Sequence, residues 1–398
     1  MATSVSLESL NEARKQTDSL FALLPPENLY ARPIDVRHRV IFYMGHLENF
    51  DWLQLERKVA GQESFHAAFD QLFEAGIDPP LGQLPRDAPQ DWPEVSAVRE
   101  YVGRIREKVD ADWESLPAER RQMVLEHRHM HAETFSYMLH NLPHEAKLAI
   151  PREATPPSSA YEQEWISIPA GRATLGLDHG NGFGWDNEFS STAVDVPTFR
   201  IQKYKVSNGD FLEFMTATGA AAPHFWRQVR GAWHFRGMFE MIPLPLDWPV
   251  WVTQAQASAY AAFRGAHLPT EAQYHRAAFG RPDGAEAAAL AGGNSDYRRW
   301  NPEPVTARPE TASPFGVAQL NGNGWEWTQT PFAPLPGFQP AGYYPAYSAN
   351  FFDNQHYVIK GASPRTAAAL HRRSLRNWFR GEYPYLYAGF RLVENGRA

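Results

Sequence analysis

The chain has 398 residues, which suggests two to three domains at roughly 150 residues per domain. Its 38 Lys and Arg residues against 45 Asp and Glu residues give a net charge of −7, which argues against nucleic acid or an anionic membrane as a partner. Cysteine is absent, which excludes disulfides, iron–sulfur clusters, thiolate nucleophiles and cysteine-ligated zinc. Any metal ion must therefore be held by imidazole and oxygen ligands.

The first 150 residues have apolar side chains at the spacing that is typical of helices. The expected helices span residues 6–24, 34–60, 94–113 and 116–142. The second stops at Gly61, and the fourth has Pro117 in its first turn. We therefore predict a four-helix bundle over residues 1–150, with a Pro- and Asp-rich loop between the second and third helices.

The start of the chain carries charge and lacks a continuous apolar stretch, so we expect no signal peptide. Nowhere do about 18 apolar residues follow one another, so no membrane span is expected. The default prediction is a soluble cytoplasmic protein.

A linker is predicted at residues 151–163, where Pro and Ser are frequent. Residues 164–398 are dense in Gly, Pro and Trp and predict a compact α+β domain with much irregular structure. Strand-like runs lie at residues 164–168, 199–201 and 357–359, and helices are expected at 207–218, at 253–264 and from Pro269 onward.

The most informative stretch is the histidine-rich part of the fourth helix. His127 and His131 are four residues apart and project from one helical face, a spacing that suits two ligands of one metal ion. His129 lies on the other side. His46, in the second predicted helix, is the candidate third ligand, while Glu133 is a flanking candidate. Three imidazoles suit iron, zinc, copper or nickel, so the ligand set alone does not choose the metal.

Five motifs in the second half together resemble the formylglycine-generating-enzyme (sulfatase-modifying factor) domain, a variant of the C-type-lectin fold. They are IPAGRATLG at 168–176, KYKVSNGDF at 203–211, GAHLPTEAQ at 265–273, NGNGWEWT at 321–328 and AGFRL at 388–392. The resemblance covers roughly residues 164–394. It implies that Trp325 and Trp327 belong to the core. Formylglycine-generating enzymes bind copper through two cysteines, so their activity is excluded here.

The first half resembles a DinB-like bundle. His127, His131 and Glu133, with Gly45-His46 upstream, are similar to the iron site of ergothioneine sulfoxide synthases. This family joins a sulfur or selenium donor to the imidazole ring of hercynine, the trimethylated histidine betaine, with O2 as co-substrate. The resemblance implies that His46, His127 and His131 bind Fe(II).

The family resemblance also implies a substrate pocket. Trp378 and Phe379 are the candidates for holding the trimethylammonium group, because aromatic faces attract such cations. The flanking Arg376 and Arg380 belong to the same stretch, RNWFR. Tyr347 is the candidate proton donor beside the metal.

Two further positions bear on the substrates. Met130 stands where the ergothioneine pattern often has Gln, next to His131, and is expected to contact substrate together with Glu133. Arg86 is the one arginine in the loop LGQLPRDAPQDW at 81–92, where ergothioneine synthases grip the donor's carboxylates with several.

This loop favours a neutral, hydroxyl-rich donor, and the resemblance then points to the selenoneine synthase branch, which takes a selenosugar. The alternative is an ergothioneine sulfoxide synthase that uses γ-glutamylcysteine or cysteine. A zinc-dependent DinB-type transferase and a non-catalytic sugar-binding module are the rivals from other classes. A structural calcium ion near NGNGWEWT is a further expectation, because related domains use Asn and backbone carbonyls there.

Overall fold

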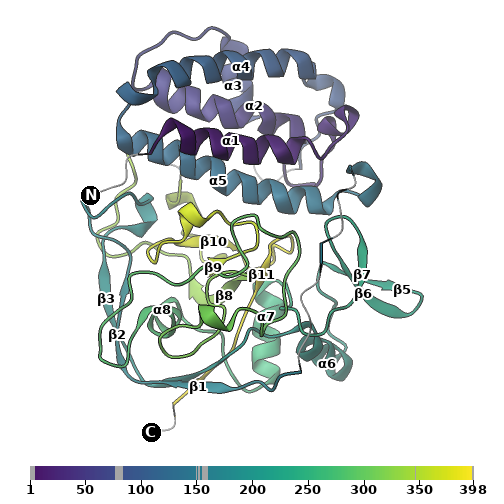
Figure 1. The fold of residues 1–398 in the computed structure, drawn as a ribbon, viewed down its shortest axis with the longest axis vertical. Coiled ribbons are helices and arrows are strands. Elements are labelled where there is room, and N and C mark those ends of the chain that lie inside the picture. The colour runs from purple at the N-terminus through teal and green to yellow at the C-terminus, as the bar shows by residue number, and fades with distance from the viewer. Residues whose placement is uncertain are drawn as a thin grey trace. The chain divides into compact units, whose positions relative to one another are not determined.

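The computed structural model describes residues 5–76, 84–148, 150, 153–154, 160–345 and 347–396. The chain divides into two compact units, Met1–Pro151 and Arg152–Ala398, which we call unit 1 and unit 2 (Figure 1). The described part of unit 1 is helical, whereas unit 2 combines helices with short strands. The predicted α+β class with a helical first domain is confirmed.

The described residues of unit 1 form five α-helices, one more than the sequence predicts. Their bounds are α1 Leu7–Phe21, α2 Val40–Asp51, α3 Ala67–Ala75, α4 Val95–Asp112 and α5 Ala118–Asn141. Helix α1 packs on α5, and α2 contacts α3, α4 and α5. Helix α2 is therefore central in the bundle. No described helix has the length and apolar character needed to cross a membrane.

Helix α2 differs from its prediction at the start. It begins at Val40 rather than at residue 34, because Arg39 has extended backbone dihedrals (φ −64°, ψ 158°). After Asp51 the chain continues as a π-helical turn, Trp52–Arg57, before the turn at Gly61. The helix thus starts later than expected, and near its end it changes from an α-helix to a π-helix.

Helix α3 was not predicted. His66 caps its start, since its ring accepts a hydrogen bond from the backbone N–H of Phe69 at 3.2 Å. Gly76, with φ of 78°, ends it. Phe69, Leu72 and Phe73 have the i, i+3, i+4 spacing of a short amphipathic helix, so the signal was present in the sequence.

Unit 2 is built from small sheets. Their strand orders are β1-β4-β12, β10-β9-β8-β11, β2-β3 and β5-β6-β7. The first eight strands are bounded by Trp165–Ile168 (β1), Gly171–Leu175 (β2), Thr192–Val196 (β3), Phe199–Gln202 (β4), Trp226–Val229 (β5), Ala232–Arg236 (β6), Met241–Pro243 (β7) and Gly324–Pro331 (β8). The last four are His356–Ala362 (β9), Asn377–Arg380 (β10), Ala388–Gly389 (β11) and Val393–Asn395 (β12). The three strand-like runs expected from the sequence fall on β1, β4 and β9.

The three helices expected in unit 2 are confirmed. They are α6 Asn208–Thr218, α7 Gln254–Phe263 and α8 Glu271–Phe279. Each begins with a capping box, in which a Ser or Thr side chain and the residue three positions later satisfy each other's backbone N–H groups. These caps fix helix starts that the sequence places within one or two residues.

A buried ion-pair group holds the centre of unit 2. The Glu326 carboxylate on β8 accepts hydrogen bonds from Lys205 at 2.6 Å and from Arg391 at 2.6 and 2.8 Å. Trp325 and Trp327 flank it on the same strand and are buried, and the Trp327 indole donates to the Val252 carbonyl at 2.8 Å. The expectation that both tryptophans are core residues is confirmed.

Candidate metal centre and aromatic group

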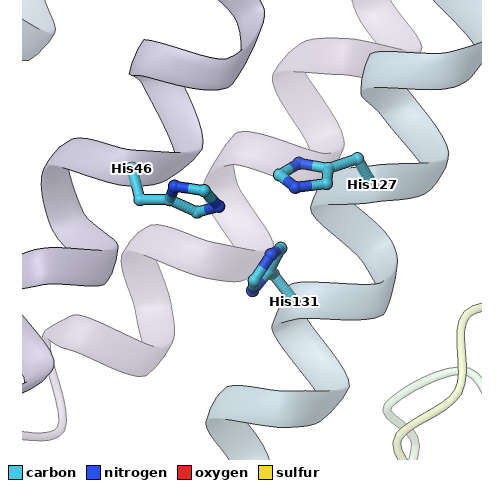
Figure 2. Close-up of side chains that lie close together, drawn as sticks. All are labelled: His46, His127 and His131. Carbon is cyan, nitrogen blue, oxygen red and sulfur yellow. The ribbon is translucent and has the colours of Figure 1, made fainter. Parts of the chain in front are cut away.

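Three histidines of unit 1 converge on one point. His46 comes from α2, and His127 and His131 come from adjacent turns of α5 (Figure 2). One nitrogen of each ring lies within 4.8 Å of the other two, a separation that a single metal ion can bridge. We call these three residues the histidine group. His129, on the same helix, does not belong to it.

Helix α3 orients the first of these rings. The Nδ1–H of His46 donates to the backbone carbonyl of Phe73 at 2.7 Å, which leaves Nε2 for a ligand bond. This contact requires a close approach of α2 and α3. A Cβ at Gly45 would overlap the Phe73 ring, so glycine is needed at that position.

Aromatic rings surround the histidine group. Phe50 stacks on His127, with centroids 3.5 Å apart and an interplanar angle of 12°. Phe42 stacks on His46 at 4.9 Å and 25°, and Tyr43 lies 5.9 Å from His131. These contacts restrict the rotamers of the three rings and keep water from their flanks.

Burial keeps the three imidazoles neutral. It lowers the pKa of His46 to about 4 and the pKa of His127 and of His131 well below the ordinary value. Mutual repulsion among the rings adds to this effect for His127 and His131. Near pH 7 each ring can therefore offer a lone pair, as metal binding requires.

The residues present fit a metal ion. The Nδ1 atoms of His127 and His131 are buried and have no hydrogen-bond partner among the described residues, and Nε2 of His46 is not engaged by Phe73. Each ring thus has a nitrogen available as a ligand. Three neutral nitrogen donors without a carboxylate suit iron, zinc or copper, and they leave further coordination positions for other molecules.

A group of stacked aromatic residues lies in unit 2. Trp378, on β10, stacks on Phe332 at 4.3 Å with an angle of 4°, and Tyr347 meets its edge at 5.3 Å and 87°. Tyr347 in turn stacks on Trp185 at 4.1 Å and 19°. We call Trp185, Phe332, Tyr347 and Trp378 the aromatic group. The structure therefore brings together two of the residues that the sequence singled out, Tyr347 and Trp378.

Comparison with known proteins places the chain in a family. Residues 9–147 match the DinB superfamily, and residues 152–396 match the sulfatase-modifying factor enzyme 1-like domain. The chain is 33% identical to the hercynine oxygenase of Mycolicibacterium smegmatis, over 75% of this chain and 78% of that protein. The chain belongs to the hercynine oxygenase family. Both halves of the predicted fold, DinB-like and formylglycine-generating-enzyme-like, are confirmed by these matches.

Two fungal proteins are also similar across most of the chain. Both are called ergothioneine biosynthesis protein 1, and they come from Neurospora crassa (25% identity) and Schizosaccharomyces pombe (27% identity). Each match covers 94% of this chain but 56% and 54% of the two relatives, respectively. The chain thus spans about half the length of these two proteins.

In this member of the hercynine oxygenase family, the other predicted site residues of the RNWFR stretch lie in different surroundings. Arg376 is buried, and its guanidinium binds Glu271 at 2.9–3.2 Å and the carbonyls of Asn187 and Ala333. Its hydrogen-bonding capacity is largely used inside the protein, so it orients the strand. The aromatic partner of Phe379 is Tyr383, at 5.5 Å, and Arg380 is exposed at the strand's end.

The predicted substrate-contacting residues of unit 1 also lie in different surroundings. Met130 and Glu133 are half-buried on α5, beside the ligands in sequence. Arg86 is exposed, in a loop whose described part is held by Asp87. The Asp87 carboxylate accepts hydrogen bonds from Arg32, from Arg39 at 2.8 Å and from the Trp92 indole at 2.7 Å.

The sequence reasoning missed Arg37. This half-buried guanidinium donates to the Tyr137 hydroxyl at 3.1 Å and is close enough to His131 to contribute to the lowering of that ring's pKa, after burial and His46. It precedes α2 in an irregular stretch, so no helical spacing linked it to the histidines. A positive charge therefore lies near the histidine group in addition to any from the loop at residues 81–92.

The expected calcium ion near the NGNGWEWT run stays a prediction, because its expected ligands are Asn side chains and backbone carbonyls. In the parts of the chain that are described, no second group of three His, Asp or Glu side chains converges as the histidine group does. Near the NGNGWEWT run, the Glu326 carboxylate is taken by Lys205 and Arg391.

Proposed function

We propose that this protein is an O2-dependent, non-haem iron enzyme that joins a sulfur or selenium donor to the imidazole ring of hercynine. The observation that carries the proposal is the histidine group, three neutral converging imidazoles, in a chain that is similar to a hercynine oxygenase along most of both lengths. Neither the histidine group nor this similarity would suffice alone, because a three-histidine site also suits zinc chemistry.

His46, His127 and His131 would hold the metal. A bound ferrous ion would supply the activation of O2 and positions at which substrates meet. The protein's own residues fix the rings: the Phe73 carbonyl sets the tautomer of His46, and Phe50 holds the plane of His127. These contacts hold the three rings so that one nitrogen of each faces a common point.

Trp378 is our candidate for binding the trimethylammonium group. Its indole is half-buried, and the edge of Tyr347 and the face of Phe332 fix its orientation. A quaternary ammonium ion is attracted to the electron-rich faces of such rings. Phe379 stays a weaker candidate, since its aromatic partner is Tyr383 rather than a member of the aromatic group.

Tyr347 is our candidate for the proton donor. Stacking on Trp185 and the edge contact with Trp378 hold its ring in place. A phenol hydroxyl can give a proton to a developing oxyanion and take it back.

We propose that the donor is a thiol, either cysteine or γ-glutamylcysteine. Two relatives are called ergothioneine biosynthesis proteins, and the Arg37 guanidinium, which contributes to the lowered pKa of His131, is our candidate for binding a donor carboxylate. One observation favours the selenosugar instead: Arg86 is exposed, and Asp87 engages the guanidiniums of Arg32 and Arg39.

The test reconstitutes the protein with Fe(II) without oxygen, then adds air, hercynine and one donor at a time. We expect oxygen consumption and a product whose mass shows hercynine joined to cysteine or γ-glutamylcysteine. A product with selenosugar alone would overturn the donor assignment and keep the reaction. Tight zinc binding with no oxygen uptake for any donor would overturn the function and favour a DinB-type transferase.

A further inference from the structure

A buried charge group lies on the far side of α2 from His46. Glu48 is two residues after His46, which places it on the opposite face of the helix. Its carboxylate is 1% exposed and accepts two hydrogen bonds from Arg128 of α5, at 3.0 and 2.7 Å. The same guanidinium donates to Asp51 of α2 at 2.7 Å. Arg128 directly follows the ligand His127.

The other long helices meet the same carboxylate. Arg106 of α4 donates to Glu48 at 2.9 and 2.7 Å, and Arg14 of α1 lies 3.8 Å from it. Asp18 and Asp110 pair with the outer ends of these two arginines. A single side chain, Glu48, thus links α2 to α1, α4 and α5.

Packing on that side of α2 is incomplete. A pocket of about 400 Å³, partly open to solvent, is lined by Met44, Leu47 and Glu48 of α2 together with residues of α1 and α4 and with Arg128 of α5. Close-packed side chains normally fix how a helix is rotated, and here part of that contact is missing. The ion pairs cross this region in place of apolar packing.

Stability alone does not account for such a group. Buried ion pairs are often no more stabilising than apolar residues of similar volume, because both charges must leave water. Here Asp51 Oδ1 and Arg128 Nε also have no hydrogen-bond partner among the described residues, so desolvation is only partly compensated. The best-attested use of such groups is to select one register of packed helices.

We infer that the Glu48–Arg128–Asp51 clamp is a positioning device for the metal centre. It fixes the rotation of α2 about its own axis and its position along α5. These two quantities set the distance from His46 to His127 and His131. On the metal side of the same helix pair, the contacts between α2 and α5 include the Phe50–His127 stack and the edge contact of Tyr43 with Phe135 at 4.9 Å, neither of which carries charge. The inference rests on the proposed metal centre, although not on the identity of the substrates.

The test is Arg128→Lys in the full chain, which keeps the positive charge but replaces the two guanidinium nitrogens that bind Glu48 and Asp51 by a single nitrogen. The matched control is Arg121→Lys, because Arg121 is also buried on α5 but binds the Val5 carbonyl and Glu114 rather than α2. Metal-free protein is titrated with Co²⁺, following affinity and the visible absorption spectrum, and its melting temperature is measured in parallel.

We expect Arg128→Lys to weaken Co²⁺ binding about tenfold and to alter the cobalt spectrum, as is typical of changes behind metal ligands. Arg121→Lys should leave the affinity and the spectrum unchanged, whatever its effect on the melting temperature. Affinity within twofold of wild type in Arg128→Lys, or equal weakening in both variants, would overturn the clamp. If Arg128→Lys does not fold, Glu48→Asp is judged by the same criteria. Failure of the wild type itself to bind Co²⁺ would instead overturn the proposed metal centre.

Discussion

The histidine group and the aromatic group are built in different ways. The three histidines come from two helices, and two of them stand one turn apart on α5, so most of the geometry follows from helical periodicity. The four aromatic residues come from four separate segments of unit 2 and meet through packing that no local spacing encodes. Helices thus fix ligand positions locally, whereas the aromatic group depends on the whole fold of its unit.

This difference predicts how each group responds to substitution. A group fixed by periodicity should fail when one member is removed and tolerate changes at helix positions that contact neither the ligands nor the facing helix. A group fixed by packing should show graded effects, because its members hold one another. The four predictions below run from the largest expected effect to the smallest.

His131→Ala should abolish iron binding and turnover, because only two imidazole ligands would remain to hold the ion. Metal analysis after reconstitution and product formation measure both effects, with losses of more than about 100-fold expected. His129→Ala is the matched control on the same helix, and it should keep its iron. Full metal content in His131→Ala would show that periodicity had misidentified the site.

Tyr347→Phe should lower kcat by about 100-fold or more while leaving KM for hercynine within a fewfold, since it removes a proton donor but keeps the ring. Steady-state kinetics on the iron-loaded protein separate the two constants. A change in KM alone would assign Tyr347 to binding through its stacking contacts rather than to proton transfer.

Low pH should destabilise the metal-free protein through the histidine group. Burial holds the pKa of His46 at about 4 in the folded state, whereas the unfolded chain has an ordinary value near 6.5. The unfolded state therefore takes up the proton first, so stability is fully present above pH 6.5 and is lost as pH falls toward 4. His46 alone accounts for about 3 kcal/mol of this loss.

Urea unfolding of metal-free protein at pH 7.5, 6 and 5 measures this dependence. His46→Ala should flatten the slope between pH 6.5 and 4, and His129→Ala serves as the reference. An unchanged slope in His46→Ala would mean that the ring is not buried in its neutral form.

Trp378→Leu should raise KM for hercynine about tenfold, because one cation–π contact is lost. Phe379→Leu is the neighbouring control on β10, and it should change KM by less than twofold. Equal effects of the two substitutions would restore Phe379 as a full member of the binding site and would enlarge the aromatic group to include it.

The sequence predicted the parts of the molecule that depend on local pattern. The helical placement of His127 and His131 four residues apart and the three helices of unit 2 follow from the pattern of short segments, and each is found in the structure. Helix α3 had the right spacing but only nine residues, too few for the pattern to stand out.

The parts that were missed depend on contacts between distant segments. Arg37 lies outside any helix, so its approach to His131 could not be derived from periodicity. Arg376 stands beside the predicted pocket residues, yet its partner is Glu271, far along the chain. Charge alone does not tell whether an arginine faces a substrate or a buried carboxylate, because that depends on the tertiary fold.

The hydrogen bond from His46 to the Phe73 carbonyl bears on how this site can change over generations. Many metal-binding histidines are oriented by a carboxylate side chain, which one codon change can remove. Here the acceptor is a main-chain atom, so substitutions of the Phe73 side chain leave the acceptor itself in place. The vulnerable position is Gly45, where any side chain would push the two helices apart. Genetic drift is therefore constrained at a residue that touches no metal and carries no functional group.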